Sequence, residues 1–370
     1  PPLHALSRSR RRARDPPEML RNKVKEPLCC CELGWTIEQI ACCPFTDWSH
    51  LIAVTGENTA LLRLSETDSS SFVLKPAAKH LSAFEGAAHT LAWGRDGDVL
   101  KLAAIHEGSI RVLQFLGDVP KGSISTSLPA EFMGADVYDS CYLPQSDLLA
   151  VTGETCRCDL LRITGDAMAS HLEVERSIHL RSEGVSVRVH AEQPDHLMVA
   201  EAGGTVHFVD LRAPNRHCPA ISRTLPSAAC GKTGLRDADW CPADPHLVGA
   251  VAGSQWFGWD LRHGGSGGLD ALAHVGEPEA HGTLAFRWAP RTPHFAIMTK
   301  GPEASIHTLS TGAGRDERGT WIVETARTQT VTHCLQTRIS SMSWLHHDTG
   351  LDGENLLAGS GDSKICIWSV

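Results

Sequence analysis

Long apolar runs are absent from this 370-residue chain, and none approaches the roughly 18 residues that a membrane-spanning helix needs. The N-terminal segment lacks the apolar centre of a secretory signal peptide, so we expect an intracellular protein without a membrane span. No stretch sustains the 3.6-residue periodicity of an amphipathic helix, which predicts little helix. With 42% hydrophobic residues and 33 glycines, the chain still has ample material for a core and for many turns.

The thirteen cysteines lack the spacing of a metal site or of a disulfide framework. Their number is odd, whereas secreted scaffolds space an even set for bridges. No two C-x-x-C pairs occur, and the adjacent cysteines at 29–31 and at 42–43 would point to opposite faces of a strand, so they cannot converge on one ion. We therefore predict no metal site, and cysteines that act as small core hydrophobes.

Signatures of nucleotide binding and catalysis are also missing. Gly231, Lys232 and Thr233 resemble the end of a phosphate-binding loop, but Pro226 stands at the first glycine position and no helix follows. No G-x-S-x-G elbow and no defensible carboxylate pair is present, so Ser, His and Asp in the turns are expected to brace those turns. We predict no cofactor, no small-molecule substrate and no enzyme activity.

A repeat of about fifty residues organises the rest of the chain. Each copy has an anchor residue, often followed by proline, then an apolar run, a glycine turn and a second strand-like run. The separations between successive anchors are 50, 49, 48, 50, 48 and 56 residues. The anchors are Cys43, Trp93, Tyr142, His190, Trp240, Trp288 and Trp344.

This period lies near the repeat length of propeller blades, about 40 to 50 residues. We predict an all-β, seven-bladed WD40-type β-propeller over residues 26–370, because a β-sandwich has no reason to keep one period seven times. The last repeat ends at Val370 directly after its third strand, so its outer strand must come from elsewhere. The segment 28–32 is the remaining candidate, and we expect this N-terminal strand to complete the last blade and close the ring.

Residues 1–25 carry eight Lys or Arg against two acids, together with four prolines. This composition predicts a disordered basic tail. Removing its charge of +6 from the total of −9 leaves the body at −15. A body this acidic repels phosphate backbones, so we expect no nucleic-acid binding by the propeller.

Three connections are expected to be longer than the usual turn. Residues 117–128 (GDVPKGSISTSL) and 264–268 (GGSGG) are predicted to be surface loops, because lengthening a loop costs little free energy. The segment 310–330 would account for the last spacing of 56 residues.

Candidate contact residues follow from two features. Side chains alternate along S-Q-W-F-G-W-D-L, so Trp256 and Phe257 point in opposite directions, and the one that does not face the core between blades is a candidate protein contact. Two repeats end in Asp-Leu-Arg, and Arg212 and Arg262 are weaker candidates, because an exposed arginine can hold an acidic partner through two bonds. The other interpretation is that Asp and Arg merely finish the strand.

The D-L-R ends resemble the W-D-x-R box of propellers that act as substrate receptors of cullin-based ubiquitin ligases. A closer resemblance comes from LMVAEAGGTVHFVDL (197–211), LVGAVAGSQWFGWDL (247–261), LAFRWAP (284–290) and the early CCPF and LIAVTG segments. These look like the small, thirty-seven-kilodalton-class WD-repeat nucleoporins of the nuclear pore outer ring. The resemblance covers residue 20 to the end and is most specific around 248–260.

That resemblance implies a non-enzymatic scaffold or adaptor subunit of the Y-shaped complex of the nuclear pore. Such a subunit docks on a large helical-solenoid nucleoporin beside other outer-ring nucleoporins, and it supports pore assembly and the transport of protein and mRNA. It implies a location at the nuclear envelope, with the kinetochore as a second place in mitosis. A ubiquitin-ligase substrate receptor is the alternative function, and a propeller hydrolase is a distant third.

Overall fold

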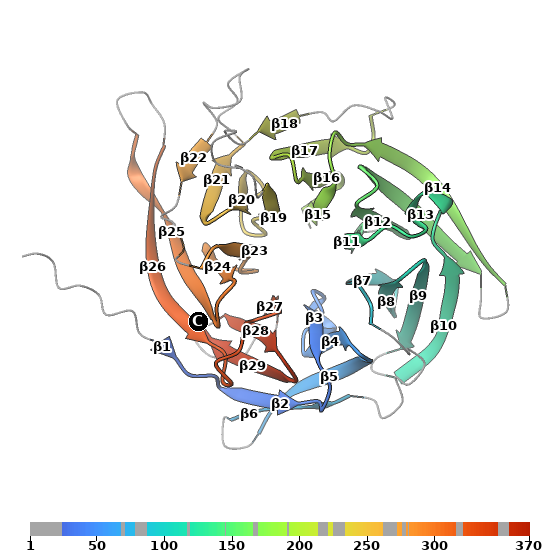
Figure 1. The fold of residues 1–370 in the computed structure, drawn as a ribbon, viewed down its shortest axis with the longest axis horizontal. Coiled ribbons are helices and arrows are strands. Elements are labelled where there is room, and N and C mark those ends of the chain that lie inside the picture. Colours follow the sequence, from blue (N-terminus) through green and yellow to red (C-terminus); the bar gives the residue numbers. More distant parts are fainter. Residues whose placement is uncertain are drawn as a thin grey trace, which may run out of the picture.

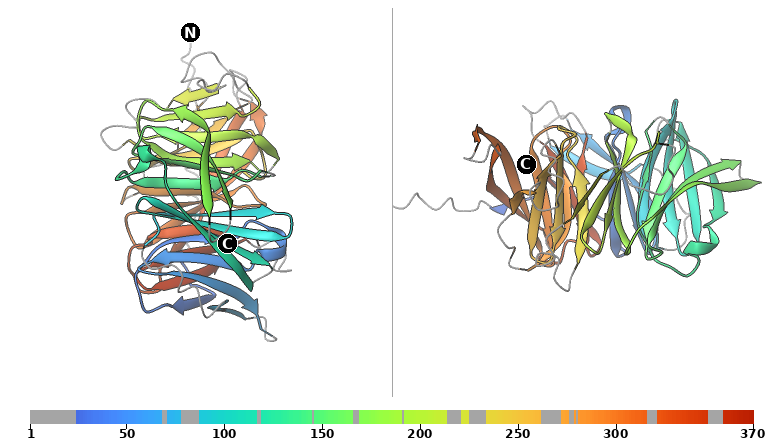
Figure 2. Two further views of the ribbon diagram at one scale, coloured as in Figure 1. Left: turned by 90° about the vertical axis from the view of Figure 1, so that its right-hand side faces the viewer. Right: turned by 90° about the horizontal axis from the view of Figure 1, so that it is seen from above.

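The computed structural model describes residues 24–67, 71–77, 87–116, 119–144, 146–165, 169–190, 192–213, 221–224, 234–261, 272–275, 279, 281–315, 321–346 and 355–370. Seven sheets stand around a central axis, which Figure 1 views end-on. The prediction of a seven-bladed propeller is confirmed. Figure 2 shows from the side that the blades form a short disc.

Each blade is built from successive strands that run outward from the axis. The innermost strands are β3 (Ile37–Cys42), β7 (Thr90–Asp96), β11 (Val137–Tyr142), β15 (Gly184–His190), β19 (Leu235–Trp240), β23 (Thr283–Trp288) and β27 (Ser341–Leu345). The second strands are β4 (Leu51–Gly56), β8 (Val99–His106), β12 (Leu148–Gly153), β16 (Gln193–Glu201), β20 (Leu247–Ala252), β24 (His294–Thr299) and β28 (Leu356–Gly361).

The outer half of each blade follows the same order. The third strands are β5 (Thr59–Glu66), β9 (Ser109–Leu116), β13 (Arg157–Gly165), β17 (Thr205–Asp210), β21 (Gln255–Asp260), β25 (Glu303–Arg315) and β29 (Lys364–Ser369). The outer strands are β6 (Phe72–Pro76), β10 (Val119–Ser127), β14 (Ser170–His179), β18 (Ile221–Thr224), β22 (Leu272–Val275), β26 (Trp321–Thr332) and, in the seventh blade, β2 (Cys29–Glu32).

Helix is minor, as predicted. The described residues contain two short 3₁₀ helices, η1 (Thr46–Trp48) and η2 (Ala130–Phe132). Within the same residues, no helix is long and apolar enough to cross a membrane.

The N-terminal strand closes the ring as predicted. β2 pairs antiparallel with β29, so that Cys29 lies opposite Ile367 and Cys31 opposite Ile365. A further strand, β1 (Val24–Lys25), pairs in parallel with β26 and adds a fifth strand to the sixth blade. β1 falls within residues 1–25, for which composition predicts a disordered tail, and this pairing corrects that boundary. Residues 1–23 lie outside the described residues.

Two of the expected connections are strands instead. Most of the segment 117–128 forms β10, which pairs with β9 along its length. Its residues are mostly exposed, with Ile124 buried, so the polar composition reflects an outer strand with a solvated face rather than a loop. The 310–330 segment extends β25 and β26 into a long hairpin, seen at the edge of the ring in Figure 1. Residues 264–268 lie outside the described residues.

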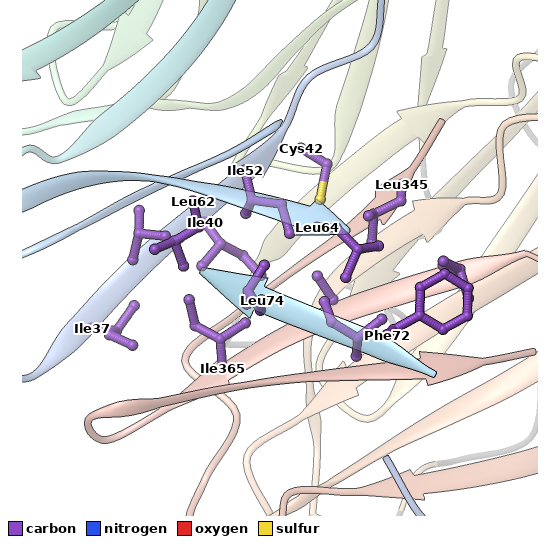
Figure 3. Packing of buried hydrophobic residues seen from close by; sticks show 14 residues of the cluster. Ile37, Ile40, Cys42, Ile52, Leu62, Leu64, Phe72, Leu74, Leu345 and Ile365 are labelled. Carbon is purple, nitrogen blue, oxygen red and sulfur yellow. The ribbon is translucent and has the colours of Figure 1, made fainter. Parts of the chain in front are cut away.

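The apolar core lies between neighbouring blades. Each cluster of buried side chains in the described residues combines strands of two adjacent sheets. Figure 3 shows the cluster between the seventh and first blades, which we call the closure seam; it contains Ile37 and Ile40 of β3 and Ile365 of β29. Cys29 and Cys31 of β2 pack against it. The ring is therefore held by blade-to-blade burial all the way round, including the junction that β2 completes.

One glycine shows how closely adjacent blades approach. A Cβ atom on Gly249 of β20 would lie 2.1 Å from the ring of Phe286 on β23 of the next blade. Glycine in a strand interior weakens the strand but allows a neighbouring group to approach. Gly249, the first glycine of V-G-A-V-A-G, is therefore needed for packing between the fifth and sixth blades.

Candidate functional site

Polar side chains of the innermost strands line the axis of the ring. They border a cavity of about 380 Å³, whose walls include Tyr138, Asp139, Arg188, Asp237 and Arg287. These residues come from β11, β15, β19 and β23. A cavity lined by convergent polar and charged groups is the usual form of a ligand site, so these side chains are the first candidates for one.

A repeated hydrogen bond links one blade to the next around this cavity. A side-chain oxygen on an innermost strand accepts a bond from a backbone N–H of the following blade, about fifty residues later in most cases. The bonds run from Val187 N to Asp139 Oδ2 (2.8 Å), Ala238 N to Ser186 Oγ (3.2 Å), Phe286 N to Asp237 Oδ2 (3.0 Å) and Ile40 N to Ser341 Oγ (3.2 Å). These oxygens satisfy backbone donors that would otherwise be buried without a partner.

Two arginines complete the network. Arg188 donates to Asp139 and lies 3.7 Å from Asp237 and 3.6 Å from Asp239, while Arg287 donates to Asp237. Burial raises the pKa of Asp139, and it raises that of Asp239 to about 6 despite the two nearby guanidinium groups. Because each carboxylate is already bound by an arginine or a backbone N–H, the network braces the ring.

The raised pKa of Asp239 predicts a pH-dependent term in stability. Between the pKa of an unfolded aspartate, about 3.9, and its folded value of about 6, the folded state binds more protons, so this term favours folding as pH falls. Relative to an Asp239→Asn variant, the wild-type free energy of unfolding should therefore rise by about 1 kcal/mol from pH 7 to pH 5. Urea unfolding of both proteins at the two pH values measures it, and a constant difference would contradict the prediction.

One described cluster combines the residue types of a hydrolytic triad. Ser305 donates to Glu279 over 2.6 Å, and His307 Nε2 lies 3.1 Å from the Ser305 hydroxyl and 3.4 Å from Glu279. Ser305 is fully buried, and its hydroxyl is directed at the carboxylate, so it cannot reach a substrate. The geometry matches turn bracing and gives no support to the hydrolase alternative.

Both aromatic candidates are buried. Trp256 is 2% exposed and packs edge-on against Phe295 of the sixth blade at 4.8 Å, while Phe257 is 1% exposed and belongs to the cluster shared with the fourth blade. The expectation that one of the pair faces outward is therefore wrong, because a blade inside a ring is covered on both faces.

The first D-L-R end forms a corner on the surface. Arg212 is exposed, and its Nε and Nη2 donate to the two carboxylate oxygens of Asp210 at 3.0 Å each. Its own backbone N–H donates to the same carboxylate at 2.9 Å. The guanidinium fork is thus already occupied by the strand end it follows. Arg262 lies outside the described residues, as do Gly231, Lys232 and Thr233.

Three cysteines from distant parts of the sequence do come together. The thiols of Cys30, Cys334 and Cys366 all lie within 4.8 Å of one another. Cys42 packs in the closure seam and Cys43 in the core between the first and second blades, so this adjacent pair is separated as predicted. Burial raises the pKa of both thiols to about 12, which suits unreactive core residues. Cysteine spacing along the chain does not reveal this cluster, because it forms only when β2 pairs with β29.

Comparison with known proteins gives partial matches. No protein-family model matches the chain. Nucleoporin Nup37 of Mus musculus is 39% identical over 134 residues, which are 36% of this chain and 37% of that protein. The Homo sapiens protein is 39% identical over 93 residues (25% and 26%), and that of Drosophila melanogaster 27% over 129 residues (35% and 36%). The chain is homologous to Nup37 over part of its length. The matched part of the chain spans between 26% and 37% of the length of those relatives.

Similarity to a solved structure extends over the whole chain but concerns the fold alone. A chain in the crystal structure of the mitotic checkpoint complex superposes with a TM-score of 0.63, covering 100% of this chain and 99% of that chain at 13% identity. It supports the propeller architecture and carries no information about partners.

Proposed function

We propose that this protein is a non-enzymatic scaffold subunit of the nuclear pore outer ring, docking on a larger nucleoporin that carries a helical solenoid. The partial homology to Nup37 carries this proposal, since the matched relatives are nucleoporins. A closed propeller braced around its axis offers rigid faces and a rim for protein contact. In this role it supports pore assembly and nucleocytoplasmic transport.

The pair Leu116 and Val119, where β9 ends and β10 begins, is the best-supported contact patch. Leu116 and Val119 are 55% and 63% exposed, and they lie directly opposite each other in the strand pairing. Two exposed apolar side chains opposite each other at the end of a strand pair suit insertion between solenoid helices. Arg212 stays a weaker candidate, because its guanidinium is already held by Asp210.

The experiment combines localisation with affinity purification from cells. Tagged protein should concentrate at the nuclear rim and co-purify with outer-ring nucleoporins, and Leu116→Glu with Val119→Glu should lose at least about 90% of that recovery, because two charges would enter an apolar contact. Val174→Glu, at another exposed apolar position, is the matched control and should behave as wild type.

Two other outcomes are informative. A diffuse signal with recovery of cullin adaptors, abolished by Arg212→Glu, would favour the ubiquitin-ligase alternative. Loss of the nuclear-rim signal in the Val174→Glu control as well would show that the patch of Leu116 and Val119 is not the specific contact.

A further inference from the structure

The three-thiol cluster lies where the ring closes. Cys30 is on β2, Cys366 is directly opposite it on β29, and Cys334 is in the turn that follows β26. The Sγ atoms of Cys30 and Cys366 are 3.3 Å apart, and those of Cys366 and Cys334 are 3.2 Å apart. The cluster thus joins the outer strand of the seventh blade, its third strand and the turn that follows the sixth blade.

The turn that carries Cys334 is fixed in place. His333 Nδ1 lies 3.1 Å from the Thr337 hydroxyl, and His333 Nε2 lies 3.3 Å from the backbone carbonyl of Lys364 on β29. The backbone N–H of Gln336 donates to the carbonyl of His333 at 2.9 Å, which closes the turn. Cys334 is therefore held against β29 by bonds that do not involve its own thiol.

We propose that Cys30, Cys334 and Cys366 form a binding site for a thiophilic d¹⁰ cation, Zn²⁺ in particular. Thiolates are the ligands that select such ions. With Zn–S bonds of about 2.3 Å, sulfurs around one ion lie about 3.8 to 4.0 Å apart, a spacing that small side-chain rotations reach from the observed arrangement. Cys30 and Cys334 are exposed, so the fourth position faces solvent and takes a water molecule.

A disulfide between Cys30 and Cys366 fits the geometry less well. Residues directly opposite each other on antiparallel strands have Cβ atoms about 4.5 to 5.5 Å apart, whereas a disulfide needs about 3.5 to 4.5 Å. A disulfide would also leave Cys334 unused. The spacing of cysteines along the chain predicts no metal site. The proposed site differs from that prediction because its three cysteines are close in space and not in sequence.

The test uses reduced, metal-free protein titrated with Zn²⁺ against a chromophoric chelator, and with Co²⁺ to detect thiolate-to-metal absorption. One ion per chain should bind, with the melting temperature rising as Zn²⁺ is added. Cys30→Ser and Cys334→Ser should each weaken Zn²⁺ binding by more than about 100-fold. Removing a group that only hydrogen-bonds to a metal ligand already lowers metal affinity by about 10- to 100-fold, and these variants remove a ligand itself. Both positions are exposed, so both variants should melt like wild type without metal.

Cys31→Ser is the matched control, because Cys31 is on the same strand and packs toward the closure seam instead. It should keep wild-type affinity. The proposal fails if reduced wild type takes up no Zn²⁺, if Cys30→Ser and Cys334→Ser bind as well as wild type, or if Cys31→Ser loses affinity as they do.

Discussion

Truncation of residues 1–33 is expected to lower the melting temperature by about 4 to 8 °C. The truncation removes β2, which covers Ile365 and Ile367 of β29 and packs Cys29 and Cys31 against the closure seam. Exposing the equivalent of two apolar side chains costs about 3 to 6 kcal/mol. An unfolding entropy of about 2.1 cal/mol/K per residue converts that cost into the stated shift for a chain of 370 residues.

Shorter truncations provide the controls. Removing residues 1–23 leaves every described strand in place and should change the melt little. Removing residues 1–27 also removes β1 but keeps β2, so it distinguishes the effect of losing β1 from the effect of losing β2. Equal melting temperatures for the truncations at 27 and at 33 would show that β2 does not close the ring.

Arg188→Met is expected to lower the free energy of unfolding by about 3 to 5 kcal/mol, because it leaves buried carboxylates without their cation. Arg188 lies within ion-pair distance of Asp139, Asp237 and Asp239, and Asp139 and Asp237 are both largely buried. Chemical unfolding at pH 7 measures the loss. Arg162→Met is the control, because Arg162 pairs with Glu175 on the surface and should contribute little.

The same variant has a second, diagnostic property. Without the guanidinium, the folded-state pKa values of Asp139 and Asp239 rise further, so the folded variant gains protons more readily than the unfolded chain. Its deficit relative to wild type should therefore shrink as pH falls from 7 to 5. A deficit that stays constant from pH 7 to pH 5 would show that lost packing, rather than unpaired charge, is responsible.

The repeating part of the fold was accessible from sequence because each blade is specified locally. Anchors such as Trp93 and Trp344 recur at the same point of the repeat, and each indole N–H donates to a backbone carbonyl of the preceding blade, at Ala41 and Arg287. Counting strands then identified β2 as the missing outer strand. The same counting could not find β1, since the sixth blade already has four strands.

Errors arose where burial depends on neighbours in the ring. The polar sequence of β10 predicts a loop, because only part of one face of this strand is covered. The alternation of side chains along a strand predicts that one of Trp256 and Phe257 points inward and the other outward. In a single sheet with one solvated face, that alternation would hold. In a propeller the second face is buried by the next blade, so both aromatic side chains are core residues.

The candidate sites were largely beyond sequence reasoning. The hydrogen-bond network around the axial cavity leaves one local trace in the sequence, an aspartate three residues before the anchor, as in Asp139 before Tyr142 and Asp237 before Trp240. The three-thiol cluster leaves none, because residues 30, 334 and 366 meet only when the ring is complete. Convergence of this kind follows from closure and not from spacing.

Closure between β2 and β29 also sets when this ring can form during synthesis. The paired residues Cys30 and Cys366 are 336 positions apart. At about 5 to 20 residues per second, a ribosome needs roughly 17 to 67 s to make the intervening chain, and during that time Ile37 and Ile40 of the first blade have no seventh blade to cover them. A nascent chain halted before Ser341 has its first six blades and presents an open apolar face for as long as it persists.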